Sequence, residues 1–256
     1  MTNAFVVVIP ARHASTRLPA KPLADIAGVP MVVRVAQRAR SSGASEVIVA
    51  TDDRRVVDVT DAYGIRSMLT DPQHRSGSDR VMEVVARAGL AADAVVVNVQ
   101  GDEPLIPPGV IDQVAQRLHA DPDIGVATLC EPIASVADLQ NPNVVKVVRD
   151  LAGRALYFTR APVPWWRDGF VPDRMPGSLP AGSWWRHIGI YGYRVKTLET
   201  YCRLPPSDLE QWESLEQLRL LSHGIPIAVD PAVAAVPAGV DTPEDLERVR
   251  RMLGGA

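Results

Sequence analysis

Three short apolar runs, separated by stretches with helical spacing, constrain the fold of this chain more than any other feature. Residues 5–9, 46–50 and 94–99 are rich in valine and nearly continuous in hydrophobicity, as strands buried on both faces are. Between the first two runs, apolar residues repeat at helical spacing: Met31, Val32, Val35, Ala36 and Ala39. Strands that alternate with helices in this way predict a doubly wound, mostly parallel sheet with right-handed crossovers.

Capping signals place the ends of two helices in this half. Pro30 suits the first position of a helix, and Gly43 suits the position just after its end. A second helix is expected to follow Asp52 or Asp53 and to stop near Gly64. Because ligands of doubly wound sheets bind beyond the carboxyl ends of the strands, residues directly after each strand are the first candidates for a site.

The second half of the chain has a different pattern. Residues 144–149 and 154–160 indicate two strands joined by a turn, a hairpin signal that the first half lacks. Residues 162–182 contain five prolines and three glycines, which excludes a helix or a central strand. A long irregular segment of this kind is typical of a lid or a partner surface. Residues 188–194 are expected to resume the sheet.

A further helix is expected behind the capping box that begins at Ser207. Its apolar positions are Leu209, Trp212, Leu215 and Leu218. Since no repeat, low-complexity tract or linker divides the 256 residues, we expect one domain over residues 1–256, with an inserted, β-rich sub-region at about 132–205.

Composition excludes several classes of protein. With 27 Lys and Arg against 30 Asp and Glu, the net charge of −3 argues against broad nucleic-acid binding. Cys130 and Cys202 are too isolated to predict a disulfide framework or a zinc cluster. No apolar run approaches the length of a membrane span or a signal-peptide core. We therefore expect a cytoplasmic protein with neither nucleic acid nor membrane as a partner.

The loop after the first strand is a candidate anion site. Arg12, Arg17 and Lys21 lie where a polyanionic ligand would bind, beside small residues that let phosphates approach backbone N–H groups. A solvated surface loop with incidental basic residues explains the pattern equally well, because the loop is neither a Walker motif nor a glycine-rich dinucleotide turn.

Two carboxylates are candidate metal ligands. Asp102 follows the run 94–99 beside a glycine, and Mg²⁺ favours one or two carboxylates together with phosphate oxygens. A simple turn also explains this segment. Thr242 and Asp245 form a capping box that accounts for residues 242–245 without any function, but it leaves Asp241 unexplained. Asp102 and Asp241 form a pair only if the fold brings them together, which spacing does not show.

Other candidate residues are explained by ordinary structural roles when they are considered without the rest of the sequence. A lone histidine such as His187 is more often a structural donor than a catalytic base. Glu213, Glu216 and Gln217 share one face of the expected helix, and charged faces usually meet solvent.

Two further groups also remain open. Ser76 and Arg80 either cap the helical run 81–88 or contact a nucleotide. Four tryptophans flank the proline-rich segment, and their default role is burial or a subunit contact: Trp165, Trp166, Trp184 and Trp185.

Taken together, these motifs closely resemble one family, the 3-deoxy-manno-octulosonate (Kdo) cytidylyltransferases. The matching blocks follow the family's order along nearly the whole chain: Ile9-Pro-Ala-Arg12, Ser15-Thr-Arg-Leu-Pro19, Lys21-Pro-Leu23, Ser76-Gly-Ser-Asp-Arg80, Asn98-Val-Gln-Gly-Asp-Glu-Pro-Leu105, Tyr157-Phe-Thr-Arg-Ala161, His187-Ile-Gly-Ile-Tyr191, Leu215-Glu-Gln-Leu-Arg219 and Asp241-Thr-Pro-Glu-Asp-Leu-Glu247. The opening blocks are shared with other sugar-activating cytidylyltransferases, whereas the later ones are more particular to the Kdo enzymes.

The resemblance implies a reaction and a fold. The reaction is CTP + Kdo → CMP-Kdo + pyrophosphate, dependent on Mg²⁺, with in-line attack by the anomeric 2-hydroxyl of Kdo. It is carried out by a homodimer and supplies activated Kdo for lipopolysaccharide. The fold is an α/β, Rossmann-like, mixed but mostly parallel sheet of the nucleotidyltransferase type, flanked by helices, with a smaller β-rich region for dimerisation and sugar binding.

The resemblance also assigns residues by matching position. Nucleotide-binding residues would be Pro10, Ala11, Arg12, Ser15, Lys21, Ser76, Gly77, Arg80 and Asp102. The sugar pocket would be lined by Gln100, Arg160, His187, Tyr191, Glu216 and Gln217. Asp102 and Asp241 would ligate the metal, and together with Arg12 and Lys21 they would be the catalytic residues.

Two residues depart from the family pattern. Ala20 stands where the family usually has glycine, which matters only if the position requires a positive φ. Trp166 stands where a polar residue is more common.

Three alternatives remain. They are a cytidylyltransferase for another acidic sugar such as sialic acid, a non-catalytic nucleotide-sugar binding protein, and a dehydrogenase. The dehydrogenase is the weakest because the first turn lacks the glycine fingerprint.

Overall fold

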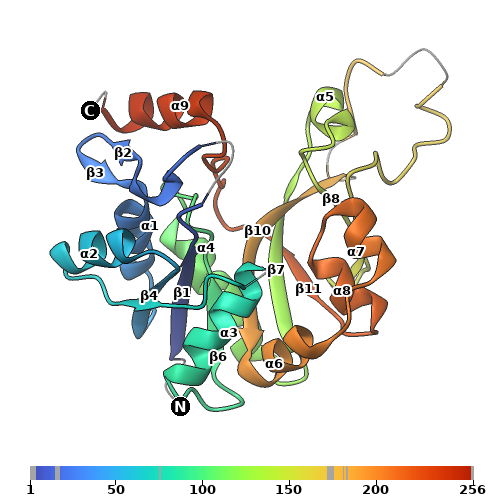
Figure 1. The fold of residues 1–256 in the computed structure, drawn as a ribbon. Helices are drawn as coiled ribbons and strands as arrows, with labels where there is room; N and C mark the ends of the chain where they lie inside the picture. Colours follow the sequence, from blue (N-terminus) through green and yellow to red (C-terminus); the bar gives the residue numbers. More distant parts are fainter. Residues whose placement is uncertain are drawn as a thin grey trace.

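A computed structural model describes residues 4–14, 18–74, 76–171, 176–180, 182 and 184–254 (Figure 1). The elements are β1 (Phe5–Ala11), η1 (Lys21–Leu23), β2 (Asp25–Ile26), β3 (Val29–Pro30), α1 (Met31–Arg40), β4 (Glu46–Thr51), α2 (Arg54–Ala62), β5 (Ser67–Leu69), α3 (Gly77–Arg87), β6 (Val95–Asn98), α4 (Pro108–Ala120), β7 (Val126–Pro132), α5 (Val136–Gln140), β8 (Lys146–Arg149), β9 (Ala155–Thr159), β10 (Trp185–Arg194), α6 (Val195–Arg203), α7 (Asp208–Glu213), α8 (Gln217–Ser222), β11 (Ala228–Pro231) and α9 (Pro243–Gly254). Within these ranges, no helix is both long and apolar enough to cross a membrane.

The central sheet is mixed but mostly parallel. Its strands lie in the order β11-β7-β10-β6-β1-β4-β5. β1 pairs in parallel with β4 and β6, β4 with β5, and β7 with β11, whereas β10 is antiparallel to both β6 and β7. Helices cover the sheet on both faces (Figure 1). The expected fold class is therefore confirmed.

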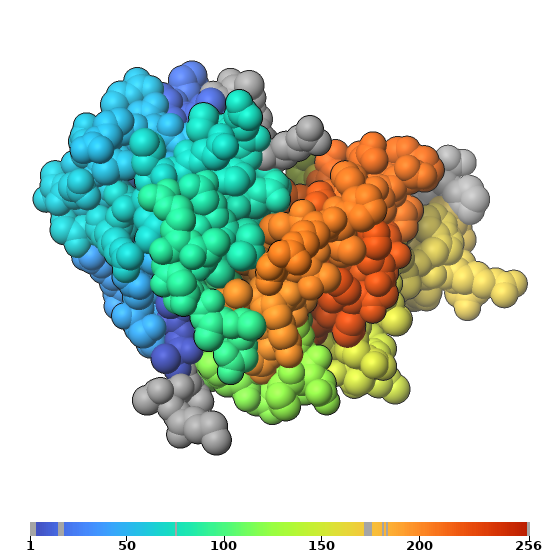
Figure 2. Space-filling model, turned by 60° about the horizontal axis from the view of Figure 1, so that its bottom comes forward, coloured from blue at the N-terminus to red at the C-terminus, as the bar shows by residue number. Residues whose placement is uncertain are grey.

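The continuous hydrophobicity of β1 follows from burial on both faces. Val7 and Ile9 lie in one apolar cluster with α1 and α4. Val6 and Val8 lie in the other cluster, with α3 and α6. Because successive side chains point to opposite faces, a strand between two helical layers needs apolar residues at every position. Figure 2 shows the α6 region (orange) against α3 (teal), which makes the second of these layers continuous.

The first half does contain a hairpin, contrary to the sequence-based expectation. β2 and β3 pair antiparallel across Ala27 and Gly28, whose φ angles are 50° and 79°. Two successive positive φ angles belong to the type I′ turn that closes two-residue hairpins. We missed it because the strands are only two residues long and Ala-Gly is a weak signal for that turn.

The single helix expected behind Ser207 is also wrong. α7 ends at Glu213, the following Ser214 has a φ of 51°, and α8 begins at Gln217. Leu209 and Trp212 are exposed. A three-residue spacing drifts around a helix of 3.6 residues per turn, so the four apolar positions could not share one face. Glu213 and Gln217, four residues apart, do not share a helical face because the break at Ser214 places them in different helices.

The expected second-half hairpin is present as β8 and β9, which pair antiparallel. Beside it, Phe170 and Trp184 form a small apolar cluster with Ile133 and Leu139, and Trp166 packs against this cluster. A Cβ on Gly169 would lie 2.1 Å from the Trp166 ring, so the tryptophan covers a position that requires glycine. The proline-rich residues 162–182 project from the body of the molecule beside α5 (Figure 1), and those of them that the structure describes form no helix.

Candidate active site

Two adjoining cavities open at the carboxyl ends of β1 and β6. The first, of about 500 Å³, is lined by Pro10, Ala11, Arg12, Ala14, Lys21, Pro22, Ser76, Gly77, Arg80, Gln100, Gly101, Asp102, Glu216 and Asp241. The second, of about 270 Å³, is lined by Gly77, Ser78, Asn98, Gln100, His187, Gly189, Tyr191, Tyr193, Ser214, Leu215, Glu216 and Gln217. The cavities meet at the residues they share, which are Gly77, Gln100 and Glu216.

Lys21 joins the two carboxylates on which the metal hypothesis depends. Its ammonium nitrogen donates to Asp102 Oδ2 at 2.6 Å and to Asp241 Oδ1 at 2.9 Å. The two carboxylate oxygens are therefore no farther apart than the sum of these distances. Burial opposes the charged form of Lys21, but Asp102 and Asp241 outweigh it and hold the pKa of Lys21 above its ordinary value.

Backbone contacts explain why residues so distant in sequence converge. The Val240 N–H donates to the Asp102 carbonyl at 2.8 Å, which pins the segment before α9 to the turn after β6. A Cβ on Gly101 would lie 2.7 Å from the Pro10 carbonyl oxygen. Glycine at position 101 thus lets the Asp102 turn lie directly against the end of β1.

Ala20 has a φ of 54° and precedes η1, which begins at Lys21. Position 20 therefore has the positive φ at which replacement of glycine by alanine costs stability. A non-glycine residue adopts the left-handed region at a cost of about 1–2 kcal/mol. That strain lies next to the residue that bridges Asp102 and Asp241.

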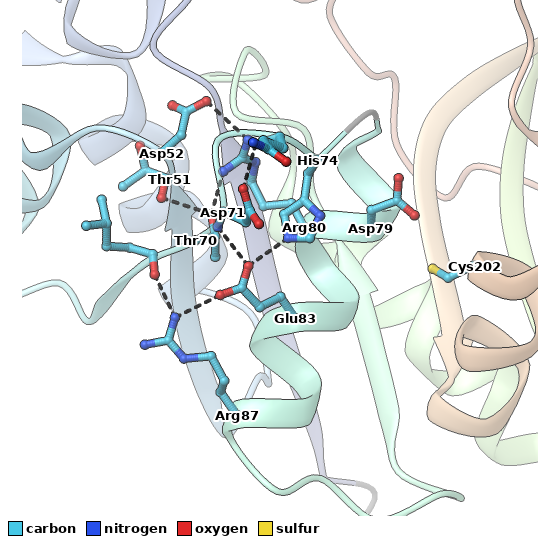
Figure 3. Close-up of polar contacts among 12 residues, drawn as sticks. Thr51, Asp52, Thr70, Asp71, His74, Asp79, Arg80, Glu83, Arg87 and Cys202 are labelled. Atoms are coloured by element: carbon cyan, nitrogen blue, oxygen red, sulfur yellow. Dashed lines mark hydrogen bonds and ion pairs between the residues drawn. The ribbon is translucent and has the colours of Figure 1, made fainter.

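The basic side of the first cavity is held by polar contacts of Arg80, which is buried, and of Arg12, which is exposed (Figure 3). Arg80 is only 1% exposed and contacts Asp52 at 3.1 Å and the Thr70 hydroxyl. Burial lowers the pKa of Arg80, and the Asp52 carboxylate opposes that effect. Arg12 donates to the carbonyl of His74 at 2.8 Å.

His74 is in turn fixed to α3. Its Nε2 lies 2.6 Å from Glu83 Oε2, and Glu83 also accepts from the Asp71 N–H at 2.8 Å and from Arg87 at 3.0 Å (Figure 3). The loop that carries the Arg12 contact is therefore attached to the same helix as Arg80.

The cap role of Ser76 is confirmed, and its predicted contact with a nucleotide is compatible with its position. It caps α3 in a capping box with Asp79, and it also lines the first cavity beside Gly77. Pro10, Ala11, Arg12, Lys21, Arg80 and Asp102 line that cavity as well. Ser15, the remaining predicted nucleotide-binding residue, lies outside the described residues.

Five of the six predicted sugar-binding residues line the second cavity: Gln100, His187, Tyr191, Glu216 and Gln217. Burial, reinforced by Arg186, lowers the pKa of His187 to about 3, so its imidazole is neutral at neutral pH. Asn98 Oδ1 and Gln217 Nε2 are buried without a hydrogen-bond partner in the described part of the chain. These two atoms are hydrogen-bonding positions open to a polar ligand or an ordered water.

Arg160 is the exception among the predicted sugar-binding residues, since it lines neither cavity. Its side chain donates to the carbonyls of Glu213 at 2.6 Å and Pro142 at 2.9 Å. It therefore supports the α7–α8 turn, whose Ser214 does line the second cavity.

Sequence reasoning missed several residues of the site, among them Asp52 and Asn98. Asp52 holds Arg80, and Asn98 lines the second cavity. Both lie at carboxyl ends of parallel strands, β4 and β6, so the rule that singled out Asp102 could have found them.

Comparison with known proteins identifies the family of this chain. A family model described as Cytidylyltransferase matches residues 6–227. A 3-deoxy-manno-octulosonate cytidylyltransferase of Alcanivorax borkumensis is 57% identical over 251 residues, covering 98% of this chain and 99% of the relative. One of Pseudomonas syringae pv. syringae is 57% identical over 256 residues, covering 100% of both.

A solved structure of CMP:2-keto-3-deoxy-manno-octonic acid synthetase complexed with CTP superposes with a TM-score of 0.88. Its sequence is 44% identical, and the match covers 98% of both chains. The chain therefore belongs to the cytidylyltransferase family and, within it, to the 3-deoxy-manno-octulosonate cytidylyltransferases.

Proposed function

We propose that this chain transfers CMP from CTP to the anomeric 2-hydroxyl of Kdo and releases pyrophosphate. The names of its relatives and the CTP complex of the similar structure support this reaction. The observation that carries it is the meeting of two cavities at Gly77, Gln100 and Glu216. The first has basic and acidic side chains suited to a triphosphate, and the second has orphaned polar atoms suited to a sugar.

CTP would bind in the first cavity. Arg12 and Lys21 would contact the phosphates and stabilise the negative charge that builds on the departing pyrophosphate. Ser76, Gly77 and Arg80 would hold the rest of the nucleotide, with Arg80 prevented from moving by Asp52. Most of the catalysis of such a displacement comes from positioning and electrostatics, and no covalent intermediate is needed.

Kdo would bind in the second cavity, against Gln100, His187, Tyr191, Glu216 and Gln217. The shared residues Gln100 and Glu216 would then orient the 2-hydroxyl toward the α-phosphorus, opposite the leaving group. Arg160 would act indirectly by supporting the Ser214 turn.

Asp102 and Asp241 would hold Mg²⁺. The residues fit this ion, because both carboxylates already face one cationic group, the Lys21 ammonium. The described residues contain no cluster of three or more His, Cys, Asp or Glu side chains that could hold a metal, so the remaining ligands would come from the substrate and water. When bound, Mg²⁺ would reduce the repulsion between the triphosphate and the acidic sugar.

The product would supply activated Kdo for lipopolysaccharide in the cytoplasm, and the enzyme would act as a homodimer. Leu156, Trp165 and Val171 are exposed apolar residues on β9 and on the segment beside α5, and they would lie in the dimer interface. Sedimentation of wild type and of Trp165→Glu tests this: a dimer that the substitution dissociates supports the assignment, and a dimer that it leaves intact contradicts it.

A pyrophosphate-release assay with CTP and Mg²⁺ tests the reaction, with Kdo and sialic acid supplied in parallel. We expect release with Kdo and little with sialic acid. Preference for sialic acid would make the chain a cytidylyltransferase for another acidic sugar. Absence of release with either would favour a non-catalytic binding protein.

A further inference from the structure

β10 contains a bulge beside the second cavity. Along the pairing with β7, Ile188 lies opposite Leu129, but the next paired residue, Tyr191, lies opposite Thr128. The irregularity displaces the backbone of Gly189 and Ile190 from the ladder. Bulges of this kind often lie next to sites and redirect a neighbouring side chain.

The Thr128 hydroxyl occupies this bulge. It is buried, and its Oγ1 lies 2.7 Å from the Ile190 carbonyl oxygen, 3.0 Å from the Ile188 carbonyl oxygen and 3.0 Å from His187 Nε2. The Tyr191 hydroxyl is buried near the same side chain without a hydrogen bond of standard geometry.

Counting protons determines the state of the imidazole. A hydroxyl has one proton to donate, and a carbonyl oxygen can only accept. The Thr128 hydroxyl must therefore donate its proton to the carbonyl oxygens of Ile188 and Ile190. If it donated to His187 instead, Thr128 Oγ1 would lie within 3.0 Å of both carbonyl oxygens with no proton between them, which is repulsive. Thr128 Oγ1 then accepts from His187, which requires the proton of the imidazole to be on Nε2.

The other ring nitrogen is left for a ligand. His187 lines the second cavity, and its Nδ1 has no hydrogen-bond partner in the described part of the chain. The ring is held edge-on to Phe158, at a centroid distance of 5.0 Å, and tilted against Tyr191 at 5.3 Å. A neutral imidazole protonated on Nε2 can only accept at Nδ1.

We propose that Thr128 is a positioning residue that holds His187 in the Nε2–H tautomer, so that Nδ1 accepts a hydrogen bond from a hydroxyl group of the acidic sugar. The proposal rests on the proposed function in one respect, that the sugar occupies the second cavity. The Nδ1 lone pair repels a carboxylate, so the sugar carboxylate must face another group. The orphaned amide nitrogen of Gln217 is a suitable donor on the same cavity.

Nitrogen-15 NMR of histidine-labelled protein at neutral pH tests the tautomer without any substrate. The chain has five histidines, and His187→Asn identifies the signals of His187. We expect a pyrrole-like shift at Nε2 and a pyridine-like shift at Nδ1. In Thr128→Val, which keeps the shape but removes the hydroxyl, we expect this pattern to be replaced by a mixture of tautomers. Thr128→Ser should restore it.

Steady-state kinetics tests the consequence for the sugar. Thr128→Val should raise KM for Kdo about five- to tenfold, with a smaller change in KM for CTP, because about one hydrogen bond is lost. Thr128→Ser should stay within about twofold of wild type. Thr60→Val is the matched control, since Thr60 also has a buried hydroxyl bonded to two carbonyls but lies on α2.

The outcomes are distinguishable. Protonated Nδ1 in the wild type, or an unchanged spectrum in Thr128→Val, overturns the proposal. If Thr128→Val does not fold, the wild-type and Thr128→Ser spectra still decide the tautomer. If the wild type transfers no CMP to Kdo while the spectrum is as expected, the proposed function fails and the assignment of the tautomer stands.

Discussion

Asp102 and Asp241, which lie 139 positions apart in the sequence, accept hydrogen bonds from the same Lys21 ammonium group, at 2.6 and 2.9 Å. The pairing depends on a backbone hydrogen bond from Val240 to the Asp102 carbonyl and on a glycine at position 101. Packing of the backbone thus produces the acidic pair, and substitutions around it should affect activity more than stability.

Lys21→Met should reduce pyrophosphate release about 100-fold, because the variant loses the cation that would stabilise the leaving group. KM for CTP should also rise. Lys196→Met is the control, since Lys196 is exposed on α6 away from both cavities. Initial rates over a range of CTP concentrations measure both constants. A Lys21→Met enzyme as active as Lys196→Met would remove Lys21 from the catalytic residues.

Gly101→Ala should leave the fold intact but lower kcat/KM at least tenfold. The new Cβ would lie 2.7 Å from the Pro10 carbonyl oxygen, so the Asp102 turn must move, and a displacement of about 1 Å can cost about 100-fold in rate. Circular dichroism checks folding, and the pyrophosphate assay checks activity. Gly254→Ala, whose Cβ has open space, is the control. Equal activity of the two variants would contradict the close approach.

Ala20→Gly should stabilise the protein by about 0.5–1 kcal/mol, because relief of the left-handed strain exceeds the added entropy of glycine in the unfolded chain. The same change at Ala86, on the exposed surface of α3, should destabilise the protein by about 0.5–1 kcal/mol. Urea unfolding measures both changes. Destabilisation by Ala20→Gly would show that position 20 does not adopt a positive φ.

The sequence was enough to predict the helices and strands that have a clear hydrophobic periodicity or capping residues. The valine-rich strands, α1, α2 and the Thr242–Asp245 cap of α9 were all found from local patterns. Backbone conformations that local patterns signal weakly were missed. The Ala27–Gly28 hairpin and the break of the helix at Ser214 both depend on a positive φ at a residue that is not glycine, Ala27 in the first case and Ser214 in the second.

The positions of the site residues were predicted correctly for most residues but not for those that depend on the turn between α7 and α8. Nearly every residue assigned by resemblance lines one of the two cavities, but Arg160 does not, because its contacts with the α7–α8 turn depend on tertiary packing. The interpretation of Gln217 as a solvent-facing residue failed for the same reason. Glu216 is exposed, as that interpretation expects, but it lines both cavities. The break at Ser214 turns the start of α8 toward the second cavity, and Gln217 is buried there.

His187 should make stability depend on pH below neutrality. Burial and Arg186 hold its pKa at about 3 in the folded state, against about 6.5 when unfolded. Between these values the unfolded chain binds more protons, so stability falls as pH falls. Since the ring is partly open to the cavity, we expect wild type to lose about 1–2 kcal/mol more than His187→Gln between about pH 7.5 and about pH 5. Urea unfolding at both pH values checks this, and equal losses would contradict a neutral, buried His187.

Replacement of each carboxylate by its isosteric amide tests the account most directly. Pyrophosphate release from CTP and Kdo should fall about 100-fold or more in Asp102→Asn and in Asp241→Asn, because each change removes one charged ligand from the proposed Mg²⁺ site. Asp58→Asn, on the exposed surface of α2, should be as active as the wild type. Near-normal rates in both Asp102→Asn and Asp241→Asn, with the proteins folded, would contradict the central claim.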